Sequence, residues 1–317
     1  MSWQPNSSHQ TARARAQMLR TARSFFESRN VLEVSTPSLS ARTSTDPNIH
    51  SIVARLSNEQ LYLHTSPEHF MKRLLAAGYP DIYQICRVYR DGEAGQHHLP
   101  EFTIIEWYRR GFELRAMMRE TAALVDAMLA RKILAQPPQQ MTYAQAFDKA
   151  LSIDPLHAET GVIAKAVGAD ATLARSLGDD RDAWLDLAMA TGVASTFPTD
   201  RLTLVYHYPA SQAALARLCP DDPAVADRFE LYWGTIELAN GFVELLDADE
   251  QRRRFQSDQE KRMSLALESY EIDSKLIDAL VSGLPPSAGV ALGLDRLLMI
   301  DESENDIRSV TTFTPGT

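Results

Sequence analysis

Apolar residues recur at helical spacing near the start of the chain and then give way to alternation. Within residues 11–29 the repeating apolar positions are Met18, Leu19, Ala22, Phe25 and Phe26. This spacing predicts an amphipathic helix. Residues 31–34 predict a short strand before Pro37.

The rest of the chain predicts short strands with helices between them. Alternation favours strands at 61–64, 81–90, 101–110 and 201–208, a hairpin at 229–242, and a strand at 290–292. Helical patterns cover 114–134 and 250–270; shorter helices start at Ser66-Pro67-Glu68, with proline at the first helical position, and at Asp295.

Residues 141–199 shift to alanine, aspartate and leucine with helical periodicity, which predicts a helical insertion. Because most strands follow one another as hairpins, we expect an α+β fold with an antiparallel β-sheet flanked by helices. We expect residues 1–317 to form a single catalytic domain.

Composition narrows the possible functions. The chain has 317 residues, 44% of them hydrophobic, a net charge of -10 and two cysteines far apart. These values predict a globular cytoplasmic protein without a disulfide framework or zinc site. No apolar run is long enough for a membrane span, and the negative charge disfavours bulk nucleic-acid binding.

Two arginine-bearing segments suggest an ATP site. Arg90 closes a predicted strand before a polar loop, and Arg296 follows the Gly-rich run 289–293 at the start of a helix. Guanidinium groups grip phosphates through planar sets of N–H donors, and a helix N-terminus favours anions. The alternative for Gly289 and Gly293 is close packing of helix and strand.

Acidic residues surround these segments. In strand 101–110, Phe102, Glu106 and Tyr108 share one face, so they line a groove or, alternatively, belong to the core and to an ion pair. A turn at Trp233-Gly234 would place Glu230 opposite Glu237. Such a pair is unfavourable unless a cation such as Mg²⁺ lies between the carboxylates; the alternative is a solvated pair splayed apart.

A further carboxylate, Glu244, follows Asn240 and Gly241. With Glu68, Glu106 and Tyr108 it predicts an acidic pocket, which suits a substrate with amino groups. His97 and His98 are adjacent but lack companion ligands, so they predict polar loop contacts.

In this order the segments resemble the catalytic domain of class II aminoacyl-tRNA synthetases of the lysyl type. The region of Pro37 resembles motif 1, residues 87–108 motif 2 and residues 289–300 motif 3. Residues 65–68 and 206–212, and Ala291 where lysyl enzymes usually have glycine, resemble a stand-alone paralogous family, the elongation factor P β-lysine ligases. The first predicted helix starts about ten residues in, which leaves no room for the N-terminal anticodon-binding OB domain of lysyl enzymes.

The resemblance implies activation of (R)-β-lysine with ATP and Mg²⁺, transfer to a lysine side chain of elongation factor P, and a homodimer. It implies Arg90 and Arg296 as catalytic residues and Glu230 and Glu237 as metal ligands. The implied ATP-binding residues are Arg90, Asp91, Gly92, Glu93, His98, Leu99, Phe102, Glu237, Leu238, Gly293 and Arg296. The implied substrate-binding residues are Ser66, Pro67, Glu68, Glu106, Tyr108, Asn240, Glu244 and Ala291.

Two positions depart from the pattern of the ligases. Gly92 stands in a run that is often Arg-Asn-Glu, and Leu99 stands where asparagine often precedes Pro-Glu-Phe. Two other functions stay open: a lysine-activating enzyme with a tRNA or small-molecule acceptor, and a synthetase-like regulatory subunit without turnover.

Overall fold

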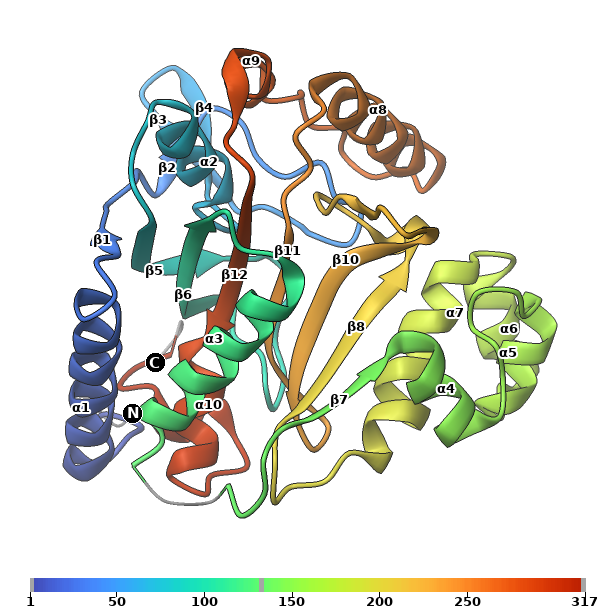
Figure 1. The fold of residues 1–317 in the computed structure, drawn as a ribbon, viewed down its shortest axis with the longest axis horizontal. Helices are drawn as coiled ribbons and strands as arrows, with labels where there is room; N and C mark the ends of the chain where they lie inside the picture. Colours follow the sequence, from blue (N-terminus) through green and yellow to red (C-terminus); the bar gives the residue numbers. More distant parts are fainter. Residues whose placement is uncertain (1–2, 131–133, 315–317) are drawn as a thin grey trace.

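A nine-stranded sheet runs through the residues that the computed structural model describes, 3–130 and 134–314 (Figure 1). Eight strands follow one another across it, and β9 (Leu218–Cys219) pairs with β10. Their order is β1 (Leu32–Glu33), β5 (Ile82–Tyr89), β6 (Glu101–Arg110), β12 (Ser287–Gly293), β11 (Ile236–Val243), β10 (Asp222–Trp233), β8 (Thr203–Pro209) and β7 (Gln139–Thr142). The pairs β1–β5 and β7–β8 are parallel, and the others are antiparallel. The predicted α+β class is therefore confirmed.

One face of this sheet packs against three helices, α1 (His9–Glu27), α3 (Leu114–Met128) and α10 (Leu294–Asp301). Ile105 and Trp107 of β6 point into this core because successive strand residues face opposite sides. Arg15 of α1 donates to Asp295 of α10, and Asp295 accepts from the backbone N–H of Thr103 at 2.6 Å. This network fixes the start of α10 against β6.

The opposite face is only partly covered. Apolar side chains of α2 (Glu68–Ala76), α8 (Ala248–Ser264) and α9 (Ser274–Gly283) pack together beside Tyr108 of β6. A second sheet, with the order β2 (Leu39–Ser40), β4 (Glu59–Leu63) and β3 (Val53–Leu56), lies near α2 (Figure 1). The face between these elements and β10 is free to form a site.

The segment predicted as a helical insertion forms a lobe beside β7 and β8 (Figure 1). Tyr143, Trp184 and Tyr232 are among the buried residues that join it to the sheet. Its elements are α4 (Tyr143–Leu151), α5 (Thr160–Ala166), α6 (Ala171–Leu177), α7 (Arg181–Ala188), a π-helical turn (Met189–Val193) and a 3₁₀ turn (Ala194–Thr196). Two further 3₁₀ turns are Ala210–Gln212 and Ile307–Val310.

Several predicted elements need correction. Pro67 is the N-cap of α2 and not its first helical residue, and α8 ends at Ser264. The strands β2, β3 and β7 and the helix α9 have no counterpart among the predicted elements. The helix predicted over 114–134 ends at Met128, and residues 131–133 lie outside the described chain.

The predicted register of the β10–β11 hairpin is wrong. The turn residues are Gly234 and Thr235, one position later than predicted, so Tyr232 pairs with Glu237, and Gly234 takes a φ of 52°. A bulge between Leu231 and Tyr232 shifts the ladder once more, so Glu230 pairs with Asn240. Glu230 and Glu237 are diagonal neighbours, not a directly opposed pair.

Candidate functional site

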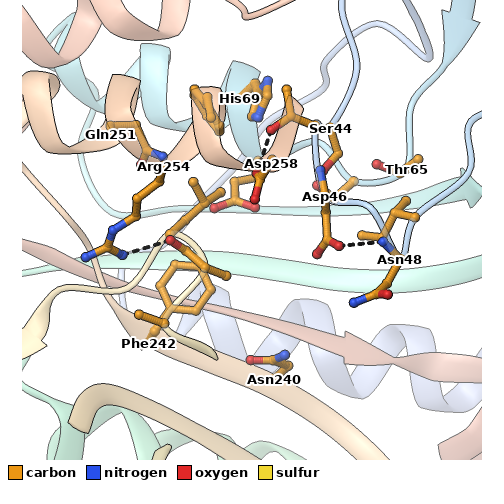
Figure 2. A pocket seen from close by; sticks show the side chains of 18 of the residues that line it. Ser44, Asp46, Asn48, Thr65, His69, Asn240, Phe242, Gln251, Arg254 and Asp258 are labelled. Atoms are coloured by element: carbon orange, nitrogen blue, oxygen red, sulfur yellow. Dashed lines mark hydrogen bonds between the residues drawn. The ribbon is translucent and has the colours of Figure 1, made fainter. Parts of the chain in front are cut away.

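A cavity of about 790 Å³ opens on the partly covered face of the sheet. In Figure 2, Gln251, Arg254 and Asp258 of α8 lie across it from Asn240 and Phe242 of β11. The loop that carries Ser44, Asp46 and Asn48 closes one side, held to α8 by a 2.8 Å hydrogen bond from Thr45 to Asp258. The cavity has room for a small polar substrate.

Glu68, Glu106 and Tyr108 line the cavity, and the buried Glu244 lies next to them, joined to Glu68 through Lys72. We call these four residues the acidic pocket. The Lys72 ammonium lies between two of these carboxylates, 2.7 Å from Glu68 Oε1 and 2.6 Å from Glu244 Oε2. Burial alone would lower the pKa of Lys72, but Glu244 and Glu68 outweigh it and raise the pKa. Lys72 is therefore charged.

Two carboxylates of the acidic pocket, Glu106 and Glu244, each have an oxygen without a hydrogen-bond partner among the described residues. Glu106 accepts from Tyr108 Oη at 2.8 Å, yet its Oε2 is buried without a hydrogen-bond partner among the described residues. Glu244 Oε1 is in the same state. Burial and the Glu68 carboxylate raise the pKa of Glu106 to about 8, and burial raises that of Glu244 to about 8 against the pull of Lys72. Buried carboxylates with free oxygens and raised pKa values favour the binding of a cation.

Gly289 of β12 allows this arrangement. A Cβ atom at this position would lie 2.5 Å from Tyr108 Cε1 and 2.6 Å from Glu244 Oε1. Any side chain here would displace the phenol and the carboxylate. Gly289 is therefore needed because it has no side chain, and not for its backbone conformation, since its φ lies outside the left-handed region.

Arg296 joins three segments where β12 leads into α10, and it is not among the residues that line the cavity. Its Nη1 donates to Glu237 O at 2.8 Å, its Nε donates to His97 O at 3.2 Å, and its Nη2 lies 2.7 Å from His98 Nε2. Gly293 caps the helix that carries Arg296. A Cβ atom added at Gly293 would lie 3.7 Å from its nearest neighbour, Leu238 O, so this position leaves room beside Arg296.

The predicted phosphate and metal residues converge around Glu237. Partial burial and the Glu230 carboxylate raise the pKa of Glu237, while Arg296, Arg228 and Arg90 oppose the rise. The pKa of Glu237 thus responds to both predicted arginines and to Glu230, the second predicted metal ligand. Its side chain remains 40% exposed, so it is open to a ligand.

Glu230 is held more tightly than the sequence predicts. Its Oε1 accepts from Arg228 at 2.6 Å, and its Oε2 accepts from Tyr208 at 2.6 Å and from Tyr232. Three donors already occupy this carboxylate. A metal ion at Glu230 would have to replace at least one of them.

Arg90 lies at the cavity wall with its guanidinium 5.1 Å from the ring centroid of Phe102. Its Nη1 is 3.3 Å from Glu93, and its Nε is buried without a hydrogen-bond partner among the described residues. Asp91 and Gly92 are exposed in the following loop, where Gly92 has a φ of 77°. Arg90 can therefore still take an anion.

Two predicted ATP contacts are core residues. Leu99 and Leu238 are buried in the main hydrophobic cluster, so their side chains face away from a ligand and only their backbones could meet one. Of the predicted substrate residues, Ser66, Asn240 and Ala291 line the cavity. Pro67 is buried at the start of α2 and positions the helix.

The sequence analysis did not single out Lys72 or Arg228. Both had a signal: Lys72 follows Glu68 by four residues on one helix face, and Arg228 precedes Glu230 by two on one strand face. A separate group, His207, Cys219 and Asp227, offers ligand atoms within 4.8 Å of one another. We assign no metal to it because Arg217 already binds Asp227 at 2.8 Å.

Comparison with known proteins identifies the family. The family model for class II tRNA synthetases (D, K and N) matches residues 1–316. A protein of Erwinia tasmaniensis named elongation factor P--(R)-beta-lysine ligase is 43% identical, over 99% of this chain and 97% of its own length. A protein of the same name from Salmonella gallinarum is also 43% identical, over 98% and 97%. No helix among the described residues is long and apolar enough to cross a membrane.

The raised pKa values of Glu106 and Glu244 predict how stability depends on pH. The folded, empty protein keeps protons that the unfolded chain loses above its ordinary carboxyl pKa of 4.5. Raising the pH from about 5 to about 8 therefore favours unfolding. Glu106→Gln should weaken this dependence by up to about 1.4 kcal/mol per pH unit in urea unfolding. Equal slopes for the two proteins would contradict the assignment.

Proposed function

Because the chain belongs to the class II aminoacyl-tRNA synthetase family, we propose that it is an ATP-dependent ligase that joins (R)-β-lysine to a lysine side chain of elongation factor P. The names of the two relatives supply the substrates. One observation in this chain supports them most: a buried acidic pocket with unpartnered carboxylate oxygens opens beside Arg90. Such a pocket suits the ammonium groups of β-lysine.

In the first step, a carboxylate oxygen of β-lysine attacks the α-phosphorus of ATP. The new O–P bond gives β-lysyl-adenylate, and the bond to pyrophosphate breaks. Arg90 would neutralise charge on the α-phosphate, and Arg296 would hold the γ-phosphate. Phe102 would stack on adenine. Asp91, Gly92, Glu93, His98 and Gly293 would border the nucleotide.

Mg²⁺ would be held by Glu237 together with Glu230. The half-exposed Glu237 carboxylate fits a hard cation, whereas Glu230 fits only if one of its donors moves. When bound, the ion would neutralise phosphate charge. Arg296 would keep Glu237 in place through its contact with the backbone carbonyl.

In the second step, the amine of the acceptor lysine attacks the carbonyl carbon of the adenylate. The amine loses a proton, the C–O bond to AMP breaks, and an amide forms. Ala291 would shape the pocket for the β-isomer, because it pairs with Asn240 on one side and with Glu106 on the other. We place the enzyme in the cytoplasm, where translation factors act.

We also propose a homodimer through the side of the molecule that carries β1. The exposed apolar residues Leu32, Leu39, Val53 and Leu56 support this surface, since they lie on the edge strand and the small sheet. Leu32→Asp should shift the protein toward monomer in sedimentation equilibrium at micromolar concentration. A wild-type monomer under these conditions would refute the dimer.

ATP/pyrophosphate exchange and acyl transfer test the function. We expect exchange to be faster with (R)-β-lysine than with L-lysine, followed by labelling of elongation factor P and not of bulk tRNA. Labelled tRNA would support a synthetase-like enzyme instead. Absence of exchange with either amino acid would support a subunit without turnover.

A substitution tests the metal ligand. Glu237→Gln should reduce exchange by at least about 100-fold, because it removes the charge that would bind Mg²⁺. Glu304→Gln, at an exposed position, is the matched control and should leave exchange unchanged. Undiminished exchange in the Glu237 variant would show that Glu237 holds no essential metal.

A further inference from the structure

Lys72 is a buried cation that the proposed reaction does not use. Its side chain is 3% exposed, and it projects from α2 into the acidic pocket. Besides Glu68 and Glu244, it lies 5.3 Å from the ring centroid of Phe242. A buried lysine needs a partner, but two carboxylates at one ammonium exceed what a single ion pair requires.

The acidic pocket has a formal net charge that follows from its titratable groups. The charged or titratable groups there come from three elements and from the residue that follows β11. They are Glu68 and Lys72 of α2, Cys86 of β5, Glu106 and Tyr108 of β6, and Glu244. Burial raises the pKa of the Cys86 thiol to about 12, so this group is neutral. Three carboxylates and one ammonium then leave a formal charge of -2 when all acids are ionised. A diamino acid brings two ammonium groups.

We propose that Lys72 is a positioning residue that holds Glu68 and Glu244 in place through its two ion pairs, so that the acidic pocket accepts a substrate with two ammonium groups. This inference deepens the proposed function and rests on it for the identity of the substrate. Lys72 itself binds neither ATP nor the amino acid; it acts through the two carboxylates.

The charge of Lys72 predicts how substrate affinity should depend on pH. Lys72 lowers the pKa values of Glu106 and Glu244, which burial and Glu68 raise. Removing the ammonium should therefore raise both pKa values further. A protonated carboxyl binds an ammonium group poorly, so substrate affinity should then improve only at higher pH.

The test compares Lys72→Met, Lys72→Arg and wild type by calorimetric binding of (R)-β-lysine between pH 6.5 and 9. For Lys72→Met we expect the Kd at pH 7 to rise at least about tenfold and the pH at which binding improves to move up by about one unit. Lys72→Arg keeps the charge and should retain the wild-type pH profile. Lys275→Met, an exposed lysine of α9, is the matched control and should behave as wild type.

Each other outcome has a distinct meaning. An equal loss of affinity in both Lys72 variants with an unchanged pH profile would overturn the inference, because it would show a packing role only. If Lys72→Met does not fold, the pH profile of Lys72→Arg decides, and a shifted profile there would count against the inference. Binding without acyl transfer to elongation factor P would refute the proposed function alone, whereas absence of diamino-acid binding by wild type would refute both.

Discussion

Three carboxylates around one buried lysine are the constraint on which the rest of this structure depends. Burying Glu106 and Glu244 next to the partly exposed Glu68, with only Lys72 as a cation, is unfavourable, and both Glu106 and Glu244 respond with raised pKa values. The fold must hold these groups together against their repulsion. A substrate with ammonium groups removes the conflict, so relief of this repulsion contributes to affinity for the ligand.

Strand alternation explains how the fold supplies both the support and the site. On β6, Ile105 and Trp107 enter the core under α1, α3 and α10, which leaves Glu106 and Tyr108 on the open face. The neighbouring strands β12 and β11 repeat this division. Pairing across the three strands joins Glu106 through Ala291 to Asn240, while Arg296 and Glu237 lie where β12 and β11 meet α10.

The sequence predicted most of this division but not all of the local geometry. Alternation in β6 was sufficient to place Glu106 and Tyr108 on one face, and both line the cavity. Arg296 lies beside Glu237 instead, 3.7 Å from its carboxylate. The pairing of Glu230 with Glu237 was wrong because the turn lies one residue later than predicted and a bulge follows it, and a bulge depends on cross-strand packing, which residue spacing does not encode. The full set of donors around Glu230 was equally hidden, since Tyr208 comes from a different strand. The sequence spacing gave a local signal for the ion pairs of Lys72 and Arg228, but only their contacts in the structure show that these residues belong to the site.

Arg296 and the carboxylates of the acidic pocket differ in how far the protein prepares them for a ligand. Arg296 is already held by backbone carbonyls of Glu237 and His97, so it is prepared before a phosphate arrives. Glu106 and Glu244 differ from Arg296, because their raised pKa values favour the protonated form until a cation binds. Binding of the amino acid should therefore be coupled to the loss of protons from the acidic pocket.

Proton release on binding is the most direct measure of that coupling. Titration of (R)-β-lysine into the protein at pH 7.5, with a non-hydrolysable ATP analogue present, can be repeated in buffers with different ionisation enthalpies. The account predicts heats that differ between buffers by an amount equal to the release of about one proton or more for each ligand bound. Equal heats in all buffers, or uptake of protons, would contradict it.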